Sequence, residues 1–203
     1  MYAYLQLGRF VEAKALLGEL PSVAARFDPG AVTGAAPGLA GAFALAAIPA
    51  RWALERGAWA EAAALEPRPS AFPFTEAMTY FARALGASHT GDLTRVRAAI
   101  DSLDSIQKRL RAGGEGYWAE QVAIQQLDAQ AALDMAEGRK SQAIARMREA
   151  ATREDATEKS AVTPGSLAPA RELLADMLAA NGKPAEARRE YRATLQTDPK
   201  RRR

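Results

Sequence analysis

The side chains that most often carry out catalysis or bind metal are nearly absent from this chain of 203 residues. His89 is its single histidine, and it has no cysteine. Disulfides, thiol catalysis, cysteine metal sites and paired-histidine metal sites are therefore excluded. His89 lies two residues before a glycine that predicts a turn, so we expect a surface histidine at a helix end, or one contact in a binding groove.

Two pairs of carboxylates have the spacing that places both members on one face of a helix. Asp101 and Asp104 are three residues apart, and Glu172 and Asp176 are four apart. Acid–base chemistry or a bound cation would require such a juxtaposition. The sequence offers neither pair a third ligand or a buried setting, so we expect solvated surface charge.

Two glycine-containing segments superficially resemble phosphate loops. Gly138-Arg139-Lys140-Ser141 lacks the earlier glycine of such a loop, and no strand is predicted before it. Gly30, Gly34, Gly38 and Gly41 lack the strand-to-helix context that would place backbone amides around a phosphate. We therefore expect no nucleotide site, no catalytic residue, no metal and no cofactor.

The composition predicts a folded, helical chain. Hydrophobic residues make up 48% and charged residues 25%, while alanine supplies about a quarter and aromatic residues only 7%. The net charge of +3 falls to −1 without Lys200, Arg201, Arg202 and Arg203. We therefore expect no nucleic-acid binding and a solvated C-terminal end. No uninterrupted apolar run is long enough to cross a membrane, so no membrane insertion is expected.

Five glycines are each followed by a new apolar run, as at the tight turn of a helical hairpin. They are Gly8, Gly57, Gly91, Gly138 and Gly182. The apolar spacing predicts five hairpins, at residues 1–20, 39–65, 75–112, 117–155 and 167–197. Segments rich in glycine, proline or polar residues predict insertions at 21–38, 66–74 and 156–166. Within the hairpins we expect an interruption or kink at Pro49 and helix N-caps at Thr75 and Asp92.

The recurring residues resemble the tetratricopeptide repeat family. The fifth hairpin matches its large-small-large pattern best, with Leu174, Ala175, Leu178, Gly182, Ala187, Tyr191 and Pro199. The second carries Gly57, Trp59 and Ala62, the third Tyr80, Gly91 and Leu93, and the fourth Gly138 and Ala143. The resemblance implies an all-α fold in which residues 1–203 form a single α-solenoid, a right-handed superhelix of stacked antiparallel hairpins.

In that family the first helix of each hairpin lines a concave groove, so the resemblance implies which residues form it here. These are Arg51, Met78, Phe81, Leu85, His89, Gln125, Asp128, Glu172 and Asp176. Such a groove would be apolar in the middle and acidic toward its C-terminal end, suited to an apolar anchor and basic groups of a peptide. The alternative is that Phe81 and Leu85 are ordinary core residues.

The main functional hypothesis is a non-enzymatic scaffold that binds an unidentified protein or peptide in this groove. The alternative is a repeat module that supports a larger enzyme or metal-binding protein. The first predicted helix is truncated, so the resemblance implies the C-terminal portion of a larger bacterial repeat protein. Charged residues from Arg9 to Glu19 exclude a signal peptide in this segment, which leaves a bacterial cytoplasmic or periplasmic location open.

Overall fold

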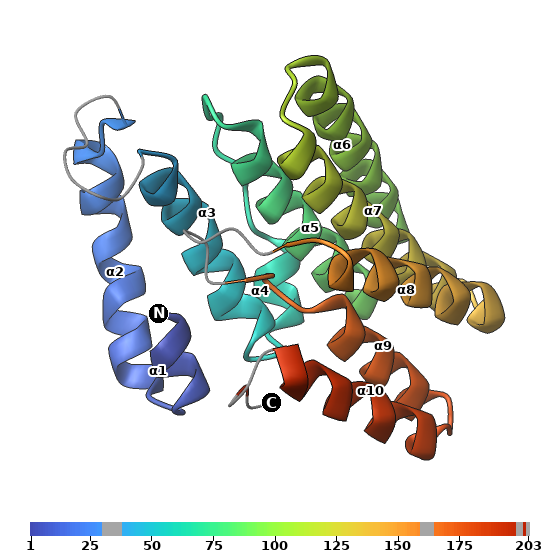
Figure 1. The fold of residues 1–203 in the computed structure, drawn as a ribbon. Helices are drawn as coiled ribbons and strands as arrows, with labels where there is room; N and C mark the ends of the chain where they lie inside the picture. The colour runs from blue at the N-terminus through green and yellow to red at the C-terminus, as the bar shows by residue number, and fades with distance from the viewer. Residues whose placement is uncertain (30–37, 159–164, 198–200, 202–203) are drawn as a thin grey trace.

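The described part of the chain is entirely helical. The computed structural model describes residues 1–29, 38–158, 165–197 and 201, and these contain no strand. Its helices are α1 (Tyr2–Gln6), α2 (Phe10–Arg26), α3 (Gly38–Leu54), α4 (Trp59–Ala63), α5 (Pro73–Thr90), α6 (Leu93–Ala112), α7 (Gly116–Ala136), α8 (Lys140–Asp155), α9 (Ala170–Ala180) and α10 (Pro184–Thr197) (Figure 1). Each packs against the next along the chain, which confirms the predicted all-α class. Among the described helices, none is both long and apolar enough to cross a bilayer.

Each of the five predicted turn glycines adopts a left-handed backbone conformation. Gly91, for example, has φ +81° and ends α5, and the other four have φ between +61° and +81°. Only glycine adopts this conformation without steric cost, so the chain can reverse there within two or three residues. Asp92 then caps α6 as predicted, because its carboxylate accepts a hydrogen bond of 3.0 Å from the Arg95 backbone N–H.

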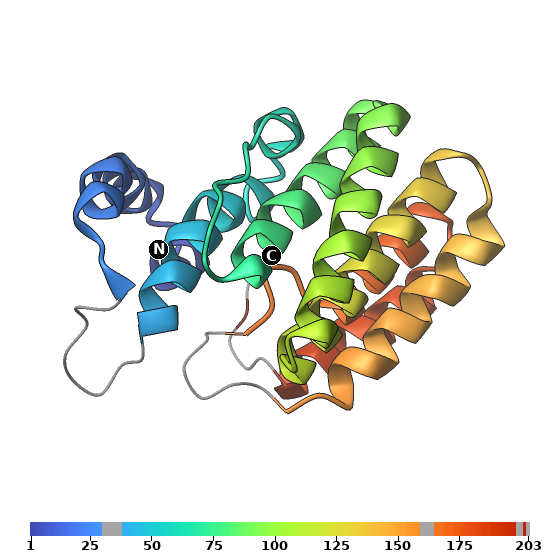
Figure 2. The ribbon, with the colours of Figure 1, turned by 90° about the horizontal axis from the view of Figure 1, so that it is seen from above.

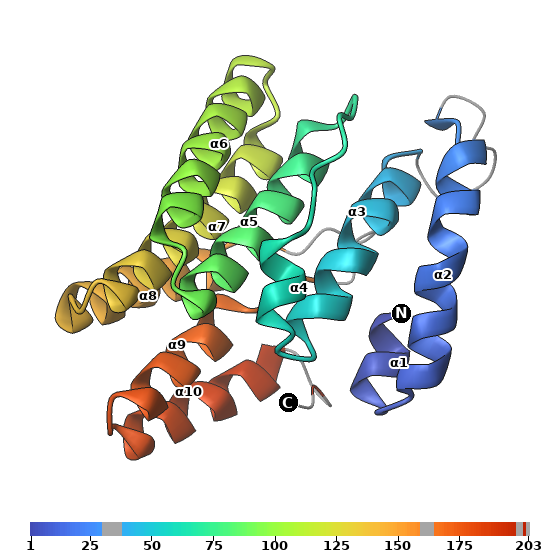
Figure 3. The same ribbon diagram turned by 180° about the vertical axis from the view of Figure 1, so that it is seen from behind.

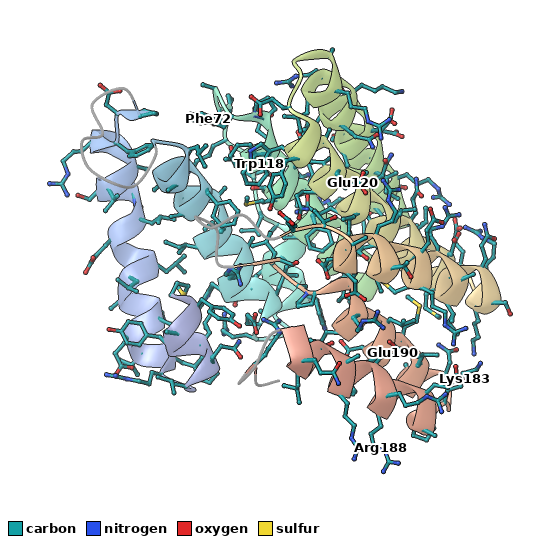
Figure 4. The ribbon with its side chains drawn as sticks, in the orientation of Figure 1. Phe72, Trp118, Glu120, Lys183, Arg188 and Glu190 are labelled. Atoms are coloured by element: carbon teal, nitrogen blue, oxygen red, sulfur yellow. The ribbon has the colours of Figure 1, made fainter. Side chains whose placement is uncertain are left out.

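Contacts between alternate helices link one hairpin to the next. Besides its neighbours in sequence, α3 contacts α1 and α5, and α7 contacts α5 and α9. The helices succeed one another along a curve in the view from above (Figure 2), and α4 and α6 come to the front when the molecule is seen from behind (Figure 3). Trp118 of α7 joins three of the odd-numbered helices, since its ring stacks on Phe74 of α5 at 3.7 Å and lies 6.3 Å from Phe43 of α3 (Figure 4).

Small side chains form much of the core. One buried cluster extends from α3 to α7 and a second from α7 to α10, and alanines are the commonest members of both. Helix backbones approach closely at Gly86 of α5, where a Cβ would lie 2.5 Å from the carbonyl oxygen of Trp59 and 2.8 Å from Cβ of Ala62. α4 can therefore cross α5 at this level only because residue 86 has no side chain.

Several helix ends differ from the sequence prediction. α2 continues through Pro21 to Arg26 and α3 through Pro49, because a proline removes one helical hydrogen bond but its own φ suits a helix. α5 begins at Pro73 and not after Thr75, since a proline fits the first helical turn. Residues 167–169, predicted to open the last hairpin, precede α9.

Replacing Gly86 by alanine should destabilise the fold, because the new methyl group would meet backbone atoms of α4 that cannot move aside. We expect a loss of about 2 to 3 kcal/mol in the free energy of unfolding, measured by chemical denaturation. Gly18 is the matched control, since it is exposed in α2 and no atom lies within 4 Å of the position that its methyl group would take. Gly18→Ala should stabilise by about 0.5 to 1 kcal/mol. Equal effects of the two substitutions would contradict the close packing of α4 on α5.

Candidate functional site

Residues 165–169 lie across the helices that were predicted to line an open groove. The surface of α3, α5, α7 and α9 that they cover is called the inner face below. Leu167 and Ala168 are 3% and 8% exposed and pack into the cluster formed by α3 to α7. Gly165 has φ +83°, and its carbonyl oxygen accepts a hydrogen bond of 2.8 Å from Nη2 of Arg51. In Figure 1 this segment passes in front of α3 and α4 before it enters α9.

Glu154, near the end of α8, holds the other end of the same segment. Its Oε1 accepts a hydrogen bond from the Ser166 hydroxyl, and its Oε2 accepts one of 2.8 Å from the Ala170 backbone N–H. Ala170 is the first residue of α9, whose early N–H groups have no partner within the helix. The carboxylate therefore satisfies a helix terminus and anchors the covering segment in one arrangement.

Arg201 occupies the acidic end of the inner face. Its Nη2 lies 3.0 Å from Oε1 of Glu55 in the turn after α3, and its Nε donates a hydrogen bond to Oε2 of Glu172 in α9. Burial alone would lower the pKa of Arg201, but the hydrogen bond to Glu172 and the charges of Glu55 and Glu172 outweigh burial and raise it. The side chain is 6% exposed, so at this residue the expectation of a solvated C-terminal end is wrong.

Six predicted groove residues lie around residues 165–168 and Arg201. They are Arg51, Met78, Leu85, Gln125, Glu172 and Asp176. Arg51 and Glu172 are each 2% exposed, and Met78 and Leu85 are 3% and 4% exposed. The chain itself therefore covers most of this surface, and a partner reaches these side chains only if residues 165–169 or Arg201 move.

The other three predicted groove residues lie outside this surface or deeper in the core. Phe81 is 1% exposed and belongs to the core cluster, which agrees with the alternative interpretation of it as a core residue. His89 is exposed at the end of α5 and stacks on Trp59 with ring centroids 3.8 Å apart. Asp128, on α7, is 2% exposed.

The residues that the sequence suggested for acid–base or phosphate chemistry form ordinary ion pairs and hydrogen bonds. Asp104 pairs with Lys108 at 2.6 Å, and Asp176 accepts a hydrogen bond from the Tyr191 hydroxyl. Arg139, in the predicted turn at Gly138, donates a hydrogen bond of 2.6 Å to Asp134. Among the described residues, no three histidine or acidic side chains are grouped so as to hold a metal ion. Gly30 and Gly34 lie outside the described residues.

An open cleft of about 370 Å³ adjoins Arg201 between α9 and α10. Its walls are Glu172, Asp176, Tyr191, Thr194, Leu195 and Arg201. Leu195 is 47% exposed and lies near two carboxylates. This cleft gives solvent access to the acidic end of the inner face, and its chemistry suits a basic or amphipathic segment.

Sequence reasoning missed Glu154, Leu167, Ala168 and Arg201. Leu167 and Ala168, apolar residues just after the polar insertion and before Pro169, were a usable signal that the chain returns to the core there. Nothing in the local sequence distinguishes Glu154 or Arg201 from neighbouring charged residues. Their partners are 12 to 16 residues away for Glu154 and 29 or more for Arg201, so only the tertiary structure identifies them.

Asp128, on α7, is a buried carboxylate with an unsatisfied oxygen atom. Burial raises the pKa of Asp128 well above its ordinary value, and the negative charge of Glu154 adds to this effect. Its Oδ1 is fully buried and has no hydrogen-bond partner among the described atoms, and the same holds for Oε1 of Gln125, three residues earlier. The folded protein therefore favours the neutral, protonated form of Asp128.

Asp128→Asn should stabilise the folded state at neutral pH, because the amide cannot ionise. The folded-state pKa lies above the unfolded value of about 3.9, so the wild type loses stability as pH rises from about 4 toward the folded-state pKa, by about 1.4 kcal/mol per pH unit. The advantage of the variant should thus be smallest near pH 4 and grow by pH 7, as measured by urea denaturation at several pH values. Asp101→Asn, at an exposed position, is the control. An advantage that does not change with pH would contradict a neutral Asp128.

Comparison of the chain with models of protein families, with curated proteins and with solved structures gave no match. The resemblance to tetratricopeptide repeats therefore depends on the residues and turns of this chain itself. The inner face, its covering segment and the adjoining cleft are the features from which a function can be inferred.

Proposed function

We propose that this chain is a non-enzymatic interaction scaffold that binds a segment of a partner protein on its inner face. The observation that carries the proposal is that this face holds a non-helical segment of the chain itself, residues 165–169. A buried leucine, an arginine bonded to a backbone carbonyl and a carboxylate bonded to a backbone N–H hold that segment. These interactions do not depend on covalent connection, so a peptide of another protein can make them as well.

The repeat geometry supports the same proposal. Five glycine turns, and contacts of each odd-numbered helix with the next one, are what a right-handed superhelix of tetratricopeptide type requires. In such an array the odd-numbered helices line one continuous face, and side chains from distant hairpins act together on one ligand. Glu55 and Glu172 already do so through Arg201, although they are far apart in sequence.

The partner segment would enter through the cleft between α9 and α10. That cleft combines an exposed leucine with Asp176 and Glu172, an apolar contact beside negative charge. A short segment with one apolar residue and one or more basic residues matches it. Aromatic or aliphatic anchors and paired charges are the usual main contributors to such interfaces.

A peptide library from the source organism, displayed and selected on the folded protein, tests this role. Affinities of the selected peptides are then measured by fluorescence anisotropy. Asp176→Ala/Leu195→Ala should weaken them at least tenfold, about 1.4 kcal/mol, because both side chains line the cleft.

The matched control is Asp101→Ala/Val11→Ala, which removes an exposed acid on α6 and an 82% exposed apolar side chain on α2. It should leave the affinities within about twofold of wild type. Equal losses in both double variants, or no selected peptide at all, would argue against binding at the inner face.

A further inference from the structure

Two carboxylates from distant hairpins share one guanidinium group at the acidic end of the inner face. Glu55 directly follows α3 and Glu172 belongs to α9, and these helices do not pack directly on each other. Arg201 bridges them, with Nη2 3.0 Å from Glu55 and 3.4 Å from Oε1 of Glu172. The three side chains are 6%, 3% and 6% exposed for Glu55, Glu172 and Arg201, respectively, so the interaction is largely desolvated.

The surrounding groups orient these carboxylates for a planar cation. Gln6 of α1 donates a hydrogen bond of 3.0 Å to Oε2 of Glu55, which leaves Oε1 directed to Arg201. Tyr2 also forms a side-chain hydrogen bond with Arg201. The guanidinium group donates hydrogen bonds to both oxygens of Glu172, a bidentate geometry that a lysine ammonium group cannot reproduce. It pairs with Glu55 by charge alone, since Oε1 of Glu55 accepts no hydrogen bond among the described residues.

The two carboxylates require a cation, and the one that lies between them comes from outside α3 and α9. Two nearly buried carboxylates without a counter-charge would repel each other and would be strongly destabilised by desolvation. Arg51 is near, but its guanidinium lies over the Tyr2 ring, 5.0 Å from the ring centroid, and bonds Gly165. The positive charge comes instead from Arg201, which lies beyond the last helix, α10.

The geometry points to an arginine subsite: we propose that Glu55 and Glu172 bind an arginine of a basic partner peptide, and that Arg201 occupies the subsite when no partner is bound. This inference rests on the proposed scaffold function and names the chemistry of its partner. Residues that flank the partner's arginine would lie in the adjoining 370 Å³ cleft, where Asp176 and Leu195 favour a second basic residue and an apolar one. The charge of the subsite excludes acidic peptides and nucleic acid.

The test measures binding of a fluorescein-labelled peptide with the sequence of residues 196–203, which ends in Lys-Arg-Arg-Arg. A matched peptide carries lysine in place of every arginine. Both are titrated by anisotropy into the full-length wild type, Arg201→Ala, and Arg201→Ala/Glu55→Gln/Glu172→Gln. Circular dichroism and thermal unfolding verify that each variant folds.

We expect Arg201→Ala to bind the arginine peptide at least tenfold more tightly than the wild type, because the subsite is vacant. It should also prefer arginine to lysine at least tenfold, and the triple variant should lose both effects. Equal affinity of Arg201→Ala and wild type, or equal affinity for the two peptides, would overturn the proposal. Because Arg201→Ala removes the guanidinium group that two nearly buried carboxylates share and can unfold the chain, Arg201→Lys is measured alongside. The arginine peptide should displace that lysine at least fivefold more readily than it displaces Arg201.

Three further measurements separate this inference from its premises. If sedimentation shows a wild-type dimer that Arg201→Ala dissociates, the occupant is a second copy of the chain and the partner subsite is wrong. If peptides selected from the library bind the Glu55→Gln/Glu172→Gln variant as well as wild type, the arginine subsite is wrong although the scaffold role stands. If the arginine peptide binds as expected but displaces no selected peptide, the subsite stands and the scaffold role at the inner face is wrong.

Discussion

Pairing of buried charge on the inner face is the constraint on which the arrangement of this molecule depends. Arg51 and Glu172 are each 2% exposed and Glu154 is half-buried, and the three side chains extend from three different helices. A buried charge without a partner costs several kcal/mol, so each of these groups needs a matching one. The matching groups come from the segment 165–170 and from Arg201. Residues 165–170 and Arg201 therefore stabilise the inner face by pairing with these charges.

The small side chains of the core explain why charged side chains lie on the inner face. Helices rich in alanine approach closely, as at Gly86, where α5 meets the backbone of α4. Close packing leaves little space for long side chains between helices, so such side chains extend from the edges of the contacts onto the inner face. Three aromatic rings, Phe43, Phe74 and Trp118, provide the bulk that joins α3, α5 and α7. The result is a thin, well-packed array with a polar surface that other segments can complete.

The sequence predicts those features of the fold that interactions between nearby residues determine. The glycine turns and the Asp92 cap are set by residues within one or two helical turns, and each is as predicted. The path of residues 165–169 and the position of Arg201 depend on partners in other hairpins, which spacing cannot reveal. Six of the nine residues chosen from the family resemblance lie around one surface. The distance in sequence from the turn glycine determines on which side of its helix each residue lies. It could not show that this surface is covered, since the covering segment follows no repeat.

Any partner that binds the inner face must compete with a segment of the same chain. A tethered ligand acts at an effective concentration of the order of millimolar, so a free peptide with one matching arginine competes poorly at micromolar concentration. The apparent affinity of a partner is reduced by the fraction of molecules in which the site is vacant. A partner must therefore gain contacts that Arg201 does not already make, and the cleft beside it, with Asp176, Tyr191 and Leu195, is where they are available. An arginine alone identifies the class of ligand, and the residues beside it decide which member of that class displaces Arg201.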